Sequence, residues 1–270
     1  MPLIHRIKVL SLILLWLIIV VNTSIMIWLP VTLFGLWVLY AVYPRFDLTP
    51  SISLKSTCKL IALTFDDGPT PGFTDKILEI LKAASIPATF FMIGSKIEQA
   101  PELARIVVSS GNEIGVHTYT HKKLHLADRK KIDSEISRTR EIIRSIYKSL
   151  NMEKDLRDIF RAPHGFKSLT LKKYLREKGI ALIPWTKGVW DTDAPGTKQI
   201  LERATQNPSV VEVLLLHDGK GMSTNITEAQ KNGVIDALPK IIDFYKNNGY
   251  TFIRVSELVK GDDNTVGSFK

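Results

Sequence analysis

Cysteine is scarce in this sequence, and charged residues are missing from one long stretch. Cys58 is the single cysteine among 270 residues, so an internal disulfide and a metal site built from cysteines are both excluded. Residues 9–43 carry no charged side chain and consist largely of Leu, Ile, Val and Trp. Internal repeats and low-complexity segments are also missing, which excludes a repeat architecture.

The uncharged stretch predicts a membrane anchor over residues 1–45. A single straight helix of that length, at about 1.5 Å per residue, would greatly exceed the roughly 30 Å hydrocarbon core of a bilayer. Breaks at Asn22-Thr23-Ser24 and at Pro30 favour two short helices folded as a hairpin, either re-entrant or spanning. A single tilted span after Asn22 is the alternative. A cleaved signal peptide fits less well, because no small-x-small cleavage site follows.

The remainder of the chain is long enough for one barrel-sized domain. Helical patterns at 74–83, 128–150, 169–178 and 229–247 alternate with short apolar runs, which end near residues 65, 93, 117, 162, 185, 216 and 255. Such alternation favours an α/β fold with a parallel sheet. We expect a linker at 46–58, one domain at 59–258 and a flexible tail at 259–270, which is rich in Gly, Asp and Asn.

Two adjacent carboxylates follow the apolar run 60–63, where a buried strand is predicted to end. Asp66 and Asp67, if both ionised, repel each other unless a cation or a proton separates them. His117 and His121 lie four residues apart after another apolar run, so both imidazoles can face one ion. Together with an aspartate from another strand end, they predict a two-histidine, one-carboxylate metal site with open positions for water and substrate.

Two further segments carry polar residues just after predicted strands. Arg161 and His164 follow one apolar run, and His217 ends another. Four of the six histidines therefore lie just beyond predicted strand ends, namely His117, His121, His164 and His217. A parallel barrel builds its active site from side chains at the carboxyl ends of its strands, so we expect these groups to meet at one site.

Five motifs in order resemble those of the polysaccharide deacetylases, also called the NodB-homology group or carbohydrate esterase family 4. They are Thr-Phe-Asp-Asp-Gly-Pro at 64–69, His-Thr-Tyr-Thr-His at 117–121, Arg-Ala-Pro-His-Gly at 161–165, a Trp/Asp segment at 185–193, and Leu-Leu-Leu-His-Asp at 214–218. The resemblance covers roughly residues 59–255. It implies a distorted (β/α)7 barrel, which the membrane hairpin or span would precede.

The resemblance implies a metal site with three protein ligands. Asp67, His117 and His121 would hold one divalent ion, expected to be zinc, with cobalt and manganese as alternatives. Amide hydrolysis needs a nucleophile and a place for developing negative charge. A metal ion meets both needs, because it lowers the pKa of water to about 7 and polarises the carbonyl group.

Four further residues receive catalytic roles by the same resemblance. Asp66 would be the general base that takes a proton from the attacking water. Arg161 would orient Asp66, and Asp191 would in turn steady Arg161. His217 would be the general acid that protonates the leaving amine.

The resemblance also points to groups that would touch the substrate. Leu215 would line the pocket for the acetyl methyl group, and the backbone N–H of His164 would help to bind the oxyanion. Tyr119, Trp185 and Trp190 are further candidates, although buried aromatic side chains commonly have only a packing role. The chain departs from the family pattern in having His164 where an aromatic residue is usual and Thr192 after Asp191 where a tryptophan is usual.

These observations together predict a metal-dependent N-deacetylase that acts on an N-acetylhexosamine of the bacterial envelope. About 16 residues separate the anchor from the first strand, a reach of at most roughly 55 Å. This short reach favours a polyprenyl-phosphate-linked or glycolipid sugar at the inner membrane over peptidoglycan or chito-oligosaccharide. The family favours a periplasmic catalytic domain, whereas a hairpin would leave both ends in the cytoplasm, and basic residues at both ends do not decide between them.

The net charge of +9 is compatible with a membrane surface as partner. The basic residues after the second motif either meet lipid phosphates or form a solvated helix face; they are Lys122, Lys123, Arg129, Lys130 and Lys131. No nucleic-acid recognition motif accompanies the charge, and no protein partner is inferred. An inactive, membrane-anchored glycan-binding module is an alternative of another class, although every motif residue that catalysis needs is present.

Overall fold

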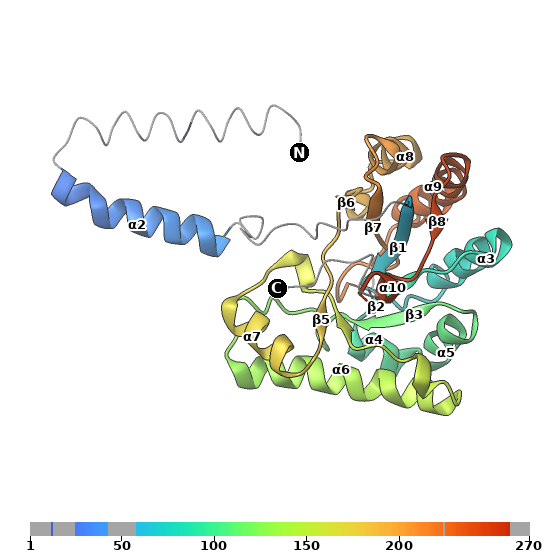
Figure 1. Ribbon diagram of the computed structural model, residues 1–270, viewed down its shortest axis with the longest axis horizontal. Coiled ribbons are helices and arrows are strands. Elements are labelled where there is room, and N and C mark those ends of the chain that lie inside the picture. Colours follow the sequence, from blue (N-terminus) through green and yellow to red (C-terminus); the bar gives the residue numbers. More distant parts are fainter. Residues whose placement is uncertain (1–11, 13–24, 43–57, 224, 260–270) are drawn as a thin grey trace. The chain divides into compact units, whose positions relative to one another are not determined.

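The computed structural model describes residues 12, 25–42, 58–223 and 225–259 (Figure 1). The chain divides into two compact units, Met1–Leu48 and Thr49–Lys270. The linker expected at 46–58 and the tail expected at 259–270 lie almost wholly outside the described residues.

In the first unit the described helix is α2 (Ile25–Val42). Leu29, Leu33 and Trp37 are more than half exposed on it. The helix continues through Pro30, so the break expected there is wrong. Pro30 is the sixth residue of this helix, so its missing N–H leaves one carbonyl of the first turn without a helical partner. Among the described residues, no helix combines the length and apolar character that crossing a membrane requires.

The second unit is built on a parallel sheet with its first strand at the centre. The strand order is β5-β4-β3-β2-β1-β7-β6, and β8 pairs with β1. Because β7 pairs along the whole of β1, strands β2 and β8 share the opposite edge of β1. The strands are β1 (Leu60–Asp66), β2 (Thr89–Met92), β3 (Glu113–Val116), β4 (Ile159–Phe160), β5 (Ala181–Leu182), β6 (Lys187–Gly188), β7 (Val211–His217) and β8 (Thr251–Phe252).

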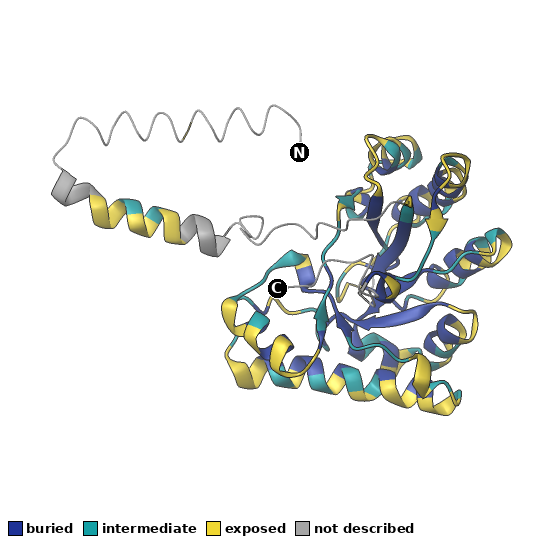
Figure 2. Ribbon diagram, in the orientation of Figure 1, coloured by how far each residue is buried: buried dark blue, intermediate teal, exposed yellow. Residues whose placement is uncertain are grey.

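Helices connect the strands and surround the sheet, with their buried residues facing inward and their exposed residues facing outward (Figures 1 and 2). The four predicted helices agree with α3, α6, α7 and α9 to within one residue at each end, whereas α4, α5 and α8 were not predicted. The elements are α3 (Thr74–Ala84), α4 (Gly94–Gln99), α5 (Pro101–Ser109), α6 (Arg129–Ser149), η1 (Glu153–Asp155), η2 (Pro163–Gly165), α7 (Leu169–Glu177), η3 (Asp191–Asp193), α8 (Thr197–Thr205), α9 (Glu228–Asn247) and α10 (Val255–Val259).

The alternation of side chains along β1 determines which residues reach the site. Ile61, Leu63 and Phe65 belong to the large apolar cluster that includes the helices. Ala62 belongs to a second cluster with Phe91, Ile159, Ile183 and Val213. Because successive side chains of a strand point to opposite faces, Thr64 and Asp66 share the inner face with Ala62. The strand therefore delivers the first motif aspartate to the interior of the curled sheet.

The sheet curls because one extended run joins its two outer strands. Within residues 181–188, β5 pairs with β4, and β6 pairs with β7. Between them the Ile183 N–H donates to the Phe160 carbonyl, and the Thr186 N–H donates to the Val213 carbonyl. The predicted parallel α/β fold is thus found as a curled half-barrel, consistent with a (β/α)7 barrel. The unpredicted strand is β6, whose Lys-Gly sequence carries no apolar signal.

Candidate active site

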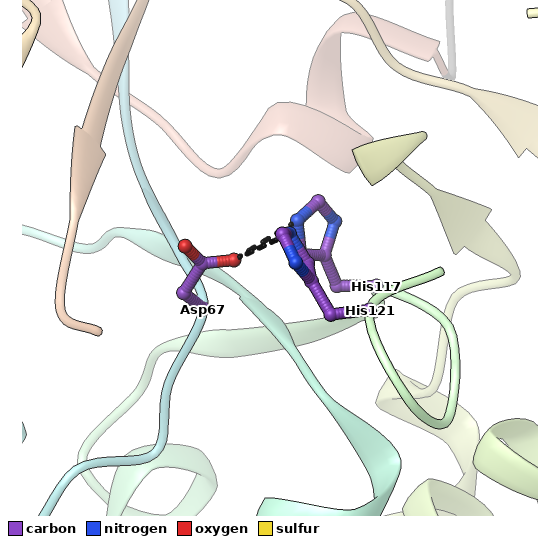
Figure 3. A group of neighbouring side chains, drawn as sticks. All are labelled: Asp67, His117 and His121. Atoms are coloured by element: carbon purple, nitrogen blue, oxygen red, sulfur yellow. Dashed lines mark ion pairs between the residues drawn. The ribbon is translucent and has the colours of Figure 1, made fainter. Parts of the chain in front are cut away.

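Three predicted metal ligands come together at the carboxyl ends of β1 and β3 (Figure 3). Asp67 follows β1, while His117 and His121 lie in the loop after β3. Their ligand atoms all lie within 4.8 Å of one another. Asp67 Oδ1 is 2.9 Å from His121 Nε2 and 3.3 Å from His117 Nε2. The backbone supports this convergence, since Asp67 and His121 both have positive φ angles, 77° and 54°.

The donor set fits a divalent cation. His117 Nδ1 lies 2.9 Å from the Arg161 carbonyl oxygen and can only donate to it, which leaves the Nε2 lone pair facing Asp67. Asp67 Oδ1 is buried and has no hydrogen-bond partner, while Oδ2 accepts from the Gly221 N–H at 2.7 Å. A lone pair and a carboxylate oxygen repel at such a distance unless a cation lies between them. One carboxylate and two imidazoles suit zinc and related divalent metals.

Charge also favours an ionised ligand carboxylate. Burial by itself would raise the pKa of Asp67. In the absence of a cation, hydrogen bonds from His117 and His121 and the charge of His217 outweigh burial and hold that pKa well below its usual range. Asp67 is therefore available as an anionic ligand at neutral pH.

Asp66, the predicted base, is held by a fully buried arginine. Arg161 Nη1 donates to Asp66 Oδ1 at 2.8 Å and to Thr64 Oγ1 at 2.7 Å. Its other donors reach the carbonyl oxygens of Ile183 and Pro184 in the run that closes the sheet. Asp66 Oδ2 is left on the side of the metal ligands, 3.8 Å from His117 Nε2. The expected contact between Arg161 and Asp66 is therefore present.

Asp191 lies against His217 and not against Arg161, so the expected partner was wrong. One carboxylate oxygen is 2.8 Å from His217 Nδ1, and the other accepts the His217 backbone N–H at 2.7 Å. The turn at η3, entered through Trp190 with φ 58°, brings this buried aspartate to the end of β7. Burial would lower the pKa of His217, but the charge and hydrogen bond of Asp191, with Asp67 and Asp66, raise it to about 10.

The groups predicted to touch the acetyl moiety lie on one side of the sheet interior. Leu215 pairs in register with Gly188, and a side chain on Gly188 would approach both Leu215 and Trp185 to within 4.0 Å. Trp185 also lies over the Arg161 guanidinium, 5.8 Å from its central carbon. His164 has a φ of 57°, and its ring centroid is 4.8 Å from that of His121. Desolvation, His121 and Lys123 lower the pKa of His164 to about 4.

Tyr119 and Trp190 were also predicted to contact the substrate. The Tyr119 hydroxyl donates to Glu98 Oε2 at 2.7 Å, and Arg138 stacks 3.7 Å from its ring centroid. These contacts direct Tyr119 toward α4 and α6. Trp190 is 49% exposed at the segment after β6. For both residues, substrate contact stays a prediction.

Comparison with known proteins identifies the family. The polysaccharide deacetylase family model matches residues 53–183. A peptidoglycan-N-acetylglucosamine deacetylase of Bacillus cereus is 31% identical over 209 residues, which cover 75% of this chain and 89% of the relative. The chain belongs to the polysaccharide deacetylase family. A chitooligosaccharide deacetylase of Sinorhizobium fredii is 30% identical over 192 residues, covering 70% of this chain and 87% of that relative.

Solved structures of polysaccharide deacetylases share the fold. The Bc1960 peptidoglycan N-acetylglucosamine deacetylase, crystallised with a naphthalenyl N-hydroxybenzamide, matches with a TM-score of 0.68 and 27% identity, covering 76% of this chain and 90% of that chain. The Xyl-CE4 domain of a xylanase from a termite hindgut metagenome matches with a TM-score of 0.66 and 30% identity, covering 79% and 96%. The predicted family is thereby confirmed, and the curled parallel sheet is consistent with its barrel.

Sequence reasoning missed several residues that support this polysaccharide deacetylase site. Glu135 on α6 is buried and accepts hydrogen bonds from the Thr120 hydroxyl and from the backbone N–H groups of Tyr119 and Thr120, so it holds the loop between the two histidine ligands. Asp218 is completely buried beside the same site. A glutamate at an inward-facing position of the predicted helix 128–150 was the signal for Glu135, and the last motif itself contains Asp218.

Proposed function

We propose that the chain is a metal-dependent N-deacetylase that hydrolyses the N-acetyl group of an N-acetylhexosamine in a glycan. The proposal rests on one observation. A carboxylate and an imidazole lie at the adjacent ends of β1 and β7, and each is fixed by its own hydrogen-bond partner. Asp66 and His217 are partners in register at adjacent strand ends. Arg161 fixes the first, and Asp191 fixes the second. Amide hydrolysis requires a base and an acid placed in this way around one carbon atom.

The two groups have complementary roles in proton transfer. Asp66 accepts a hydrogen bond from Arg161 with one oxygen and has the other available to take a proton from water. His217 carries a proton at neutral pH because its pKa is raised to about 10, so it can donate to the leaving amine. A bound divalent cation would supply a Lewis acid that polarises the carbonyl group and acidifies water. Leu215 and Trp185 bound the apolar side on which an acetyl methyl group would fit.

The substrates named for the relatives support a glycan rich in N-acetylglucosamine. The two relatives named above are deacetylases of peptidoglycan N-acetylglucosamine and of chitooligosaccharides. The test is incubation of the purified chain with each of these glycans and a divalent metal, followed by mass spectrometry for loss of acetyl groups. Asp66→Asn is the matched negative control. Turnover by the wild type alone is expected, and no turnover of either glycan with metal bound would favour the inactive glycan-binding module.

A lipid-linked N-acetylhexosamine at the bacterial inner membrane is the second candidate substrate. Its support is the uncharged stretch 9–43 together with four exposed apolar side chains on segments that follow β3, β4, β6 and β7. These side chains are Leu126, Leu169, Trp190 and Met222. Exposed lysines accompany them on two of these segments at 122, 123 and 220. Apolar and basic side chains together suit the interface of an anionic membrane, and the domain would face the periplasm.

This second candidate is tested with a polyprenyl-phosphate N-acetylhexosamine in liposomes, alongside chito-oligosaccharide. Acetyl loss from the lipid-linked sugar alone would establish it. Deleting residues 1–43 should then reduce turnover of the embedded sugar while leaving turnover of the soluble glycan unchanged. Equal effects of the deletion on both substrates would contradict the role of the anchor.

A further inference from the structure

Asp67, the predicted metal ligand, is fixed by hydrogen bonds to its carbonyl oxygen, its carboxylate and its N–H. Its carbonyl oxygen accepts from Lys96 Nζ at 2.7 Å, and its carboxylate Oδ2 accepts from the Gly221 N–H at 2.7 Å. Its own N–H donates to the Phe91 carbonyl. These contacts fix a residue whose φ of 77° is unfavourable for a non-glycine side chain. Without them, the left-handed conformation that turns Asp67 toward the histidines would lose its support.

Asp218 lies directly behind this turn. Its Oδ2 accepts from the Thr74 hydroxyl at 2.7 Å, and its backbone N–H donates to the Asp66 carbonyl. A side chain on Gly68 would lie 2.0 Å from Asp218 Oδ2, so the carboxylate occupies the space that a larger residue would need. Likewise, a side chain on Gly219 would lie 2.1 Å from the Asp67 carbonyl oxygen. The segments after β1 and β7 are therefore in close contact.

The remaining oxygen of Asp218 has no hydrogen-bond partner and is buried. A buried carboxylate with an unpartnered oxygen is costly, and none of the five motif roles uses it. Lys96, which comes from α4, faces both Asp67 and Asp218 electrostatically. We name Lys96 and Asp218 the Asp67 support.

We propose that the Asp67 support sets the metal affinity of the site by positioning the Asp67 carboxylate, an inference that rests on the metal site of the proposed function. Residues that orient a metal ligand typically contribute 10–100-fold to metal affinity. Lys96 and Asp218 do not contact the ion in this arrangement. Lys96 donates to the Asp67 carbonyl, whereas the Asp218 backbone N–H donates to the carbonyl of Asp66, the preceding residue.

Substitution of Lys96 separates two explanations, because positioning of Asp67 and electrostatic repulsion of the cation predict opposite changes in metal affinity. A lysine near the site repels a divalent cation, so removing its charge should strengthen metal binding if electrostatics alone acts. Positioning predicts that Lys96→Met weakens binding, because the Asp67 carbonyl loses its donor. The same substitution at Lys76, an exposed residue of α3, is the matched control.

The experiment is a competition titration of the metal-free full chain with Zn²⁺ and a chromophoric chelator, without substrate. We expect the dissociation constant to rise about 10–100-fold for Lys96→Met. It should be unchanged for the control Lys76→Met. Urea unfolding of each metal-free variant checks that it folds cooperatively, and Lys96→Gln replaces Lys96→Met if that variant does not.

Tighter binding, or a dissociation constant within about twofold of wild type in a folded Lys96 variant, would overturn the proposal. Failure of the proposed function has a different signature. It would appear as a wild-type protein that binds Zn²⁺ with the expected dependence on Lys96 yet removes no acetyl group from any glycan.

Discussion

Replacing Asp191 with asparagine removes the charge that keeps His217 protonated. Both carboxylate oxygens of Asp191 contact His217, at 2.7 and 2.8 Å, and the aspartate is only 2% exposed. An opposite charge at this range shifts a pKa by about 1–3 units, which corresponds to about 1.4–4 kcal/mol. Asp191→Asn is therefore expected to lower the pKa of His217 by about 1–3 units from its raised value of about 10.

The direction of the effect on activity follows from the proposed role of His217 as the general acid. A general acid works while protonated, so the alkaline limb of the kcat profile should move to lower pH by the same amount. A bound cation offsets the negative charges of Asp66 and Asp67. It therefore lowers the pKa of His217, and with it the pH of the alkaline limb, in wild type and variant alike. The difference between variant and wild type is therefore the quantity to measure. Stability should follow the same group: the ion pair contributes fully below about pH 6.5 and is lost as the pH rises through about 10.

The assay is kcat on a soluble chito-oligosaccharide across the pH range, with NMR titration of the His217 imidazole. Asp193→Asn is the control, because Asp193 lies in the same short helix η3 but is exposed. Coincident alkaline limbs for wild type and Asp191→Asn, with both proteins folded, would refute the reasoning. The stability of Asp191→Asn should also depend less on pH between about 6.5 and 10, as urea unfolding would measure.

Three further substitutions test other parts of the site. Asp66→Asn should lower kcat by about 10²–10⁴-fold while elemental analysis finds unchanged metal content, and loss of metal as well would contradict its role as base. His121→Ala should lower metal content in the same analysis, whereas Lys122→Ala should not, because only the former supplies a ligand atom. Arg161→Met leaves Asp66 buried without its cation and should lower the free energy of unfolding by about 3–5 kcal/mol in urea denaturation; a loss below about 1 kcal/mol would speak against the buried pair.

The parts of the site that the sequence revealed are those that follow an apolar strand directly. Asp67, His117 and His121 were predicted as one cluster, and their ligand atoms do converge. Parallel strands deliver their carboxyl ends to one edge, so polar residues after apolar runs identify such a cluster without knowledge of the register. The helices predicted at 128–150 and 229–247 were also found, because a helical pattern of apolar residues extends over the whole length of each.

The parts that escaped prediction depend on turns and on partners distant in sequence. Asp191 could have met either Arg161 or His217, since both are cationic, and only the turn through Trp190 decides between them. Tyr119 lies between the two predicted histidine ligands in sequence. Thr118, the residue before it, has a positive φ, and the Tyr119 hydroxyl donates to Glu98. Strand β6 was missed because Lys187–Gly188 has no apolar pattern, and backbone pairing with β7 alone defines it.

The contact between the segments after β1 and β7 has a consequence for how the protein is made. Gly221 and Asp67 are 154 residues apart, so synthesis at about 5–20 residues per second leaves roughly 8–30 s between their appearance on the ribosome. All three metal ligands are translated by residue 121. During that interval the nascent chain carries every ligand but lacks the segment that orients Asp67. Metal loading is therefore expected to follow completion of β7, so that the ion enters a domain whose translation is nearly finished.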